Sequence, residues 1–180
     1  SELIEKSVAN NESELTHTGA LLSLTGNRTG RSPKDRFIVQ ESSTKDKIDW
    51  GDVNKPFDSN HFDKLWEKVS AYLDDKEHYV SNVHVGSNKD HYIPVEVKSE
   101  LAWHSLFSKL IFISPEIFNE ENKEVWKIVT AANYVCDPEE DHTNSESCVI
   151  INFLRRKVLI AGMKYAGEMK KSMFAVQNFL

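Results

Sequence analysis

Residues 157–180, KVLIAGMKYAGEMKKSMFAVQNFL, hold three consecutive patterns that decide the fold of this chain. The stretch begins with the apolar residues 158–161, whose length and β-branched content are typical of a buried strand. Gly162 and Gly167 then indicate a turn in which backbone can approach a ligand closely. After Gly167 a helix is predicted by the spacing of Met169, Met173, Val176 and Leu180. A strand, a glycine turn and a helix in this order direct helical N–H groups toward an anion.

Two adjacent lysines, Lys170 and Lys171, follow the start of this predicted helix. A positive charge near a helix N-terminus is disfavoured by about 0.3–1 kcal/mol, and adjacent cations also repel each other. Both effects favour a neutral amine, which can bind a metal ion or take part in proton chemistry. A solvated basic turn explains the spacing as well, so the spacing alone leaves both interpretations open.

Residues 25–33, TGNRTGRSP, are predicted to form a loop because two glycines and a proline fall close together. Gly26 and Gly30 are separated by three residues where a P-loop needs four, and Arg31 stands where a P-loop needs lysine. We therefore exclude a P-loop. An arginine presented by a glycine loop is suited to binding a carboxylate in bidentate fashion, and a solvated arginine in a surface turn is the alternative.

Longer segments carry a family resemblance. YAGEMKKSMF, residues 165–174, closely resembles the signature of the ATP-dependent phosphoenolpyruvate carboxykinases. TGRSPKDRFIV, residues 29–39, resembles the second signature of the same family. WGDVNKP (50–56) and LAWHSLF (101–107) also look like family segments, so the resemblance covers nearly the whole chain.

The resemblance implies an activity and a set of site residues. Enzymes of this family convert oxaloacetate and ATP into phosphoenolpyruvate, carbon dioxide and ADP, a step of gluconeogenesis. By resemblance, Arg31 would hold a substrate carboxylate, Tyr165 would contact the substrate or the departing carbon dioxide, and Gly167 would offer its backbone N–H. Lys171 would bind the transition metal as a neutral amine, and Lys170 would stabilise the enolate and the transferring phosphoryl group. Mn²⁺ and Mg²⁺ with ATP are the implied cofactors of the full-length enzyme.

The resemblance also implies a domain organisation. Residues 1–180 would form a single N-terminal domain that binds oxaloacetate or phosphoenolpyruvate. No GxxxxGK[ST] motif is present, so ATP would bind through a C-terminal nucleotide-binding domain that is absent from this chain, as are the remaining metal ligands. The chain by itself is not expected to turn over. The alternative is a stand-alone, non-catalytic module that binds dicarboxylates or phosphoenolpyruvate.

Composition is that of an ordinary soluble globular domain, with 39% hydrophobic and 28% charged residues. A net charge of −6 argues against nucleic acid as a partner. The sequence has no apolar run of the ~18 residues that a membrane helix needs, and no signal peptide is recognisable. Cys136 and Cys148 are too few for a disulfide framework and form no CxxC, so we expect free thiols and a cytoplasmic location.

Along the chain, the patterns predict an α/β domain with a mixed β-sheet flanked by helices, in the manner of the N-terminal domain of the phosphoenolpyruvate carboxykinase fold. Helices are expected at 1–9, 60–74, 101–107 and after Gly167, with Ser59 or Asn60 as the N-cap of the second. Strands are expected at 20–24, 36–39, 78–85, 92–97, 110–113, 125–134, 148–153 and 158–161.

Two further features are interpreted as structural. His104 lies in the apolar segment LAWHSLF, which favours a half-buried histidine with satisfied hydrogen bonds over a ligand. The acidic segment 137–147, DPEEDHTNSES, lacks the regular spacing of a metal site. Glu96 departs from the family pattern, which usually has arginine between the two valines, but it is not among the implied site residues.

Overall fold

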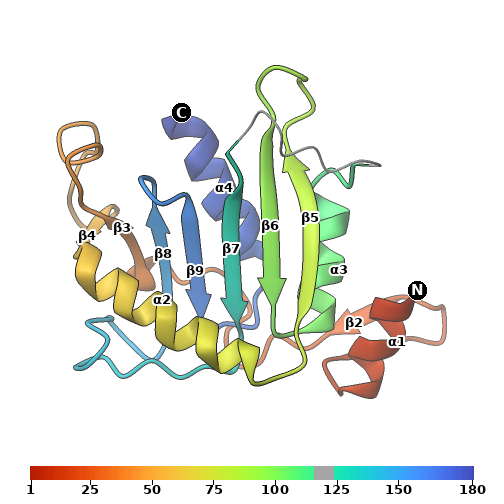
Figure 1. Ribbon diagram of the computed structural model, residues 1–180. Helices are drawn as coiled ribbons and strands as arrows, with labels where there is room; N and C mark the ends of the chain where they lie inside the picture. Colours follow the sequence, from red (N-terminus) through yellow and green to blue (C-terminus); the bar gives the residue numbers. More distant parts are fainter. Residues whose placement is uncertain (116–123) are drawn as a thin grey trace.

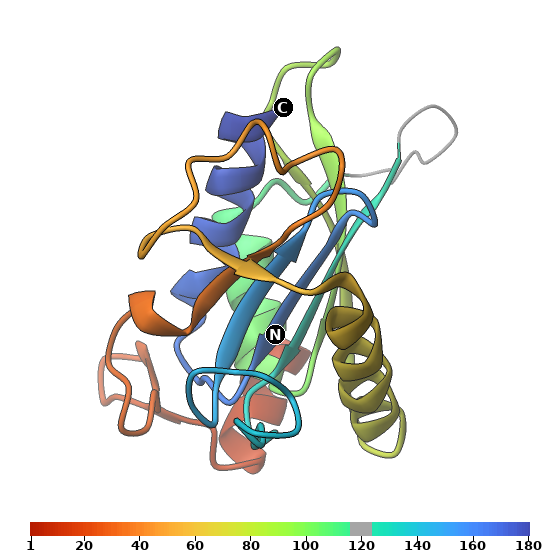
Figure 2. The same ribbon diagram turned by 90° about the vertical axis from the view of Figure 1, so that its left-hand side faces the viewer.

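The computed structural model describes residues 1–115 and 124–180. Among these residues, seven strands form one mixed sheet in the order β4-β3-β8-β9-β7-β6-β5, and helices cover both faces (Figure 1). A side view places α2 on one side of the sheet and α4 on the other (Figure 2). The predicted α/β class with a mixed sheet flanked by helices is confirmed. In the described part of the chain, no helix is long and apolar enough to span a bilayer.

The helices and strands have the following bounds. The helices are α1 (Glu2–Ala9), α2 (Ser59–Asp74), α3 (Ala102–Ile111) and α4 (Gly167–Phe179), with a 3₁₀ turn η1 (Pro33–Asp35). A separate two-stranded antiparallel sheet is formed by β1 (Ser13–Leu15) and β2 (Leu21–Ser23). The large sheet contains β3 (Arg36–Val39), β4 (Lys55–Phe57), β5 (Tyr79–Val85), β6 (Ile93–Ser99), β7 (Trp126–Ala131), β8 (Cys148–Asn152) and β9 (Lys157–Ala161).

The large sheet is mixed, and its central strands have the apolar composition of strands that are covered on both faces. β8 is antiparallel to β9, whereas β3 pairs parallel with β8 and β7 pairs parallel with β9. All five residues of β8 are buried, because layers cover both faces of the sheet, and such strands read as continuous apolar runs. The strands expected at 78–85 and 92–97 are confirmed as β5 and β6, which form an antiparallel hairpin that pairs from Tyr79–Ser99 to Val85–Ile93.

Two hydrophobic clusters lie between the sheet and the helices, one on each face of the sheet. On one face, Phe62, Leu65 and Val69 of α2 pack against the sheet. On the other face, Met169 and Met173 of α4 pack together with residues of α3 and the sheet. Cys136 and Cys148 are free and buried in the first cluster, with their Sγ atoms 3.8 Å apart. The predicted free thiols are confirmed.

Three local predictions are wrong. Residues 110–113 are not a strand, because α3 continues to Ile111 and Ile113 forms only an isolated bridge with His84. The N-cap of α2 is Asp58, whose carboxylate accepts hydrogen bonds from the backbone N–H groups of Asn60 (2.8 Å) and His61 (3.0 Å). Leu180 is 76% exposed and does not belong to the apolar face of α4.

Candidate functional site

The site begins at the turn that follows β9. Gly162 has φ +70°, its N–H donates to the Ala131 carbonyl, and its own carbonyl accepts from the Ser147 hydroxyl at 2.8 Å. A Cβ at Gly162 would lie 2.5 Å from the Glu146 carbonyl oxygen. Glycine is therefore required here by both the left-handed backbone and the lack of space.

The next glycine packs against the predicted tyrosine. Gly167 is the first residue of α4, and a Cβ there would lie 2.5 Å from Cε1 and 2.9 Å from Oη of Tyr165. The half-buried Tyr165 ring thus lies directly over the start of α4. The structure therefore brings together these two residues, both singled out from the sequence.

A buried acid joins the arginine loop to the lysine helix. The backbone N–H of Ser32 donates to Glu168 Oε1 at 2.9 Å, across 136 residues of sequence. Glu168 is fully buried, and its second oxygen, Oε2, has no hydrogen-bond partner among the described residues. This bond places Arg31, the residue before Ser32, at the N-terminal part of α4. Sequence analysis missed Glu168, although an acid beside two lysines in YAGEMKK was an available signal.

Another buried acid holds the loop itself. Asp35 is 3% exposed and accepts hydrogen bonds from Arg28 (2.6 Å), Ser145 (2.7 Å), Asn144 (3.2 Å) and Ser32. Burial alone would raise the pKa of this carboxyl, but these hydrogen bonds together lower it below its ordinary value. The loop is thus fixed at two points, which leaves the Arg31 side chain exposed between them.

Two arginines that form no salt bridge with a described residue lie near these anchors. The side chains of Arg31 and Arg36 make no hydrogen bond or ion pair with any described residue, and the two guanidinium groups interact electrostatically. Burial lowers the pKa of Arg36 from its ordinary value, Glu168 opposes this shift, and Arg31 adds to it. Arg36 is a second residue that sequence analysis missed, because nothing in the pattern RFIV shows which face of the strand it occupies.

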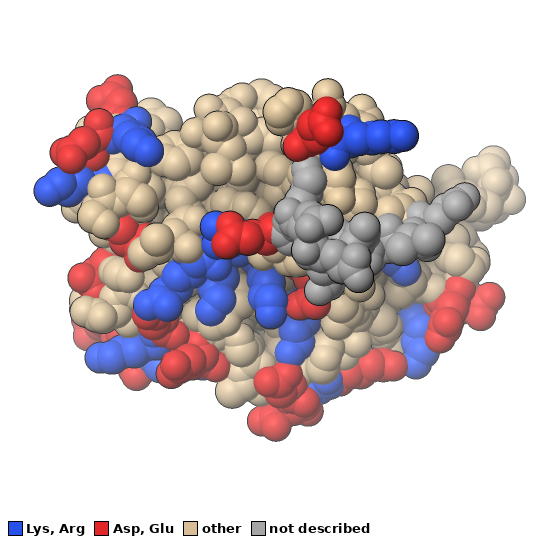
Figure 3. Space-filling view, turned by 45° about the horizontal axis from the view of Figure 1, so that its top comes forward, with Lys and Arg blue, Asp and Glu red and all other residues tan. Residues whose placement is uncertain are grey.

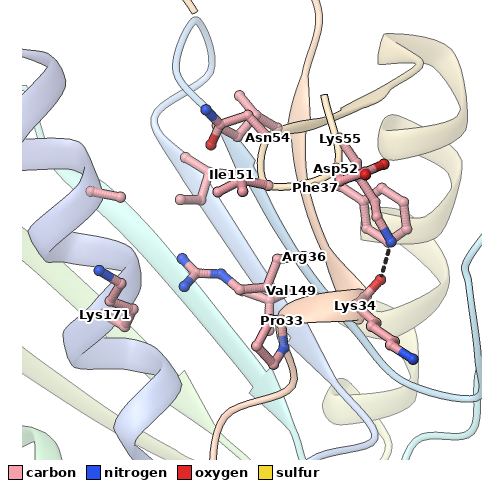
Figure 4. Close-up of a pocket in the computed structure, with 13 residues that line it drawn as sticks. Pro33, Lys34, Arg36, Phe37, Asp52, Asn54, Lys55, Val149, Ile151 and Lys171 are labelled. Carbon is pink, nitrogen blue, oxygen red and sulfur yellow. Dashed lines mark hydrogen bonds between the residues drawn. The ribbon is translucent and has the colours of Figure 1, made fainter. Parts of the chain in front are cut away.

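The two lysines face different hollows. Lys171 is half-buried and lines a hollow of about 560 Å³ together with Arg36 (Figure 4). Lys170 is exposed and lines a separate hollow of about 290 Å³ on the other side of α4, with Met173 and Phe174. Neighbouring helical residues point about 100° apart, which explains this division.

A second cluster of basic side chains, at the β8–β9 turn, differs from Arg31 and Arg36 because its arginines form salt bridges with acidic side chains. Lys and Arg side chains gather near the middle of the face in Figure 3, with Asp and Glu side chains close to them. At the β8–β9 turn, Arg155 pairs with Asp63 at 2.5 Å and Arg156 pairs with Glu124. Lys157 lies over a tryptophan ring. Unlike Arg31 and Arg36, these cations have a salt bridge or a ring contact with a described residue.

The two features interpreted as structural, His104 and the acidic segment 137–147, make the following contacts. His104 is 1% exposed, which is more buried than predicted, and its ring nitrogens lie 2.9 Å from the Lys164 carbonyl and 3.2 Å from the Thr130 hydroxyl. Burial lowers its pKa to about 4, against a smaller raising effect of the Lys164 carbonyl, so the ring is neutral near pH 7. In the acidic segment, Asp141 pairs with Lys68 at 2.8 Å. The described residues contain no group of three or more His, Cys, Asp or Glu placed to hold a metal.

The chain is thus an α/β domain in which arginine side chains without salt bridges lie beside a glycine turn and the start of a helix. This arrangement is typical of anion-binding sites. Residues 1–180 match the family model described as phosphoenolpyruvate carboxykinase. Relatives named phosphoenolpyruvate carboxykinase (ATP), from Bacillus cereus (strain AH187) and Bacillus anthracis (strain A0248), are each 47% identical over 183 residues. This chain belongs to the ATP-dependent phosphoenolpyruvate carboxykinase family.

The similarity covers 99% of this chain but 34% of each relative, so the chain spans about a third of the length of the curated relatives it matches. The family resemblance expected from the two signatures is therefore confirmed over the whole chain. The mixed sheet flanked by helices is consistent with an N-terminal domain of this family.

Proposed function

We propose that this chain is the substrate-binding, N-terminal domain of an ATP-dependent phosphoenolpyruvate carboxykinase. The complete enzyme would convert oxaloacetate and ATP into phosphoenolpyruvate, carbon dioxide and ADP. Residues 1–180 would bind oxaloacetate or phosphoenolpyruvate, and parts of the protein outside this chain would bind ATP. By itself the chain is then not expected to turn over. The cytoplasmic location stays a prediction.

The hydrogen bond from the Ser32 N–H to Glu168 carries the proposal. It draws together the two sequence segments that hold Arg31 and the residues Tyr165–Lys171. Arg31 is exposed and unpaired among the described residues, so its guanidinium is free for a bidentate contact with a substrate carboxylate.

The remaining residues suit the chemistry of decarboxylation. Loss of carbon dioxide from oxaloacetate leaves negative charge on the former keto oxygen, and a cation fixed in advance stabilises that charge without reorganisation. Lys170, which is exposed and lies on a different face of α4 from Lys171, would supply a cation to the enolate and to the phosphoryl group, whose charge is spread over its oxygens. The Tyr165 ring and the Gly167 N–H would orient the substrate against the start of α4.

Lys171 fits one position of a metal site. Its side chain is half-buried and has no acid partner among the described residues, which leaves its nitrogen available as a ligand to Mn²⁺. The described part of the chain provides no further cluster of ligands, which is why the other ligands would come from outside it. When bound, the metal supplies positive charge beside the developing enolate. Mg²⁺ would accompany ATP.

The test uses the complete protein as its gene encodes it. Arg31→Ala should raise the KM for oxaloacetate by about 10–100-fold, the effect of losing a charge-assisted bidentate contact of about 1.5–3 kcal/mol. Lys171→Ala should mainly weaken Mn²⁺ affinity. Arg155→Ala is the matched control, since Arg155 is paired with Asp63 in the separate basic cluster. Unchanged affinities in both variants would refute the assignments. Substrate binding without turnover by the complete protein would favour the stand-alone binding module.

A further inference from the structure

The acidic segment 137–147 lies between the arginine loop, residues 25–33, and the glycine turn at Gly162. Figure 1 shows the segment at the end of the sheet where β9 ends and β8 begins. On its outer side, Asp141 pairs with Lys68 of α2 at 2.8 Å, which ties the segment to the body of the domain. Its last residues contact both the arginine loop and the glycine turn. The segment is therefore placed to connect these two parts of the candidate site.

The hydroxyl of Ser145 makes the contact with the arginine loop. It donates to Asp35 Oδ1 at 2.7 Å, and it accepts from Arg28 Nη2 at 3.2 Å and from the Ser147 N–H at 3.3 Å. A hydroxyl has one hydrogen to donate and two lone pairs to accept with, so these three bonds use its full capacity. Arg28 pairs with Asp35 at 2.6 Å and also donates to the Ser32 hydroxyl at 2.5 Å. The Ser145 hydroxyl thus completes the set of contacts that fixes the loop.

Ser147 continues the connection to the glycine turn. Its hydroxyl donates to the Gly162 carbonyl at 2.8 Å, and Gly162 lies shortly before Tyr165 in the chain. The serine link, formed by Ser145 and Ser147, is the second connection between the arginine loop and the residues that follow β9. The bond from the Ser32 N–H to Glu168 is the first. Two connections fix an orientation, whereas one alone leaves the loop free to pivot about it.

We propose that Ser145 is a positioning residue for oxaloacetate binding and that it acts through Arg31. The inference rests on the proposed function, in which Arg31 binds a substrate carboxylate while Tyr165 and the Gly167 N–H orient the substrate. These contacts form together only where the loop has the correct orientation, and a loop that is ordered during binding lowers the affinity. Without the Ser145 hydroxyl, the loop would pivot about Ser32 and the Arg31 guanidinium would lose its preset place.

The test compares Ser145→Ala with Asp137→Ala in the complete protein as its gene encodes it. Asp137 is the matched control, because its carboxylate accepts hydrogen bonds within the same segment, from the N–H groups of Glu139 (2.9 Å) and Glu140 (3.2 Å), and none from the arginine loop. We expect Ser145→Ala to raise the KM for oxaloacetate about 10-fold and Asp137→Ala to change it by less than about 2-fold. Ser145→Thr keeps the hydroxyl and should recover most of the loss. The KM for ATP should stay within about 2-fold in all three variants, and equal rises of both KM values in Ser145→Ala would overturn the proposal.

A double variant identifies the path of the effect. If Ser145 acts through Arg31, adding Ser145→Ala to Arg31→Ala should raise the KM for oxaloacetate by less than about 2-fold. A further rise of about 10-fold in that background would overturn the proposal. An unchanged KM in Ser145→Ala, together with a raised KM in Arg31→Ala, refutes the positioning role and leaves the proposed function standing.

Hydrogen exchange tests the serine link without any substrate. Ser145→Ala should speed the exchange of backbone amides in residues 28–36 by about 10-fold or more, and Asp137→Ala should not. Equal exchange in Ser145→Ala and the unchanged protein would overturn the positioning role. Faster exchange, combined with an unchanged KM for oxaloacetate in Arg31→Ala, refutes the proposed substrate contact of Arg31 and leaves Ser145 as the residue that holds the loop.

Discussion

The contact between Gly167 and the Tyr165 ring makes Gly167→Ala an informative change. The new methyl group would lie 2.5 Å from Tyr165 Cε1, where ordinary contact begins at 3.4 Å, so the ring has to move by roughly 0.9 Å. A ring can swing away, because the obstruction is side chain and not backbone. A misplacement of about 1 Å at a reacting centre can lower activity by about 100-fold, equivalent to about 2.7 kcal/mol of transition-state stabilisation.

Stability should change little in the same variant. Alanine in place of glycine favours a helix by up to ~1 kcal/mol, which offsets part of the cost of moving the ring. We therefore expect kcat/KM of the complete protein to fall about 100-fold while the unfolding free energy changes by less than about 1 kcal/mol. Gly51→Ala is the control, since a Cβ there meets nothing within 4 Å.

A double variant decides whether the ring carries the effect. In a Tyr165→Ala background the methyl group has no ring to displace, so adding Gly167→Ala should lower kcat/KM by less than about 2-fold. A full further loss of about 100-fold in that background would refute the reasoning. So would an unchanged kcat/KM in Gly167→Ala itself.

Three other predictions follow from the anchors of the site and the core. Glu168→Ala leaves the Ser32 N–H without its acceptor and should raise the KM for oxaloacetate about 10-fold. Glu168→Gln keeps an acceptor oxygen and should recover part of the loss. Equal KM values for the two variants in steady-state kinetics would contradict this. Gly162→Ala should cost about 3 kcal/mol in urea unfolding, because φ is positive and the Cβ meets the Glu146 carbonyl; a cost below 1 kcal/mol would be contrary. The pKa of His104 is lowered to about 4 in the folded protein, so the unfolded chain is protonated first as the pH falls. The neutral ring therefore contributes its full stability above pH ~6.5, and the unfolding free energy should fall by about 3 kcal/mol between pH ~6.5 and pH ~4. His104→Asn should reduce this pH dependence of the unfolding free energy.

Sequence patterns predicted the long, strongly periodic elements and the short strands β2 and β3, but missed the three-residue strands β1 and β4. The α2 helix was found because Phe62, Leu65 and Val69 repeat on one face, and these side chains are buried. β4 spans only Lys55–Phe57 and contains a proline, so it carries no strand pattern, and it is defined by parallel pairing with β3. The apolar run at 110–113 was wrongly predicted to be a strand, because so short a run does not distinguish a strand from the end of a helix, and α3 continues to Ile111.

The sequence predicted some residues of the candidate site, but it revealed neither Glu168 and Arg36 nor the way in which the site is assembled. The signatures pointed to Arg31 and Lys171, whereas the bond between Ser32 and Glu168 depends on packing that no local pattern encodes. Arg36 could not be assigned to a hollow until β3 was paired with β8, since the side-chain direction follows from that register.

The position of β8 and β9 in the middle of the sheet has a consequence for synthesis. β5 and β6 are close in sequence and can pair soon after both have left the ribosome. β3 must wait for β8, and about 110 residues separate the two strands. At 5–20 residues per second this wait lasts roughly 5–20 s. Since Ser32 is held by Glu168 of α4, the arginine loop can take its final place only after nearly the whole of this chain has been translated.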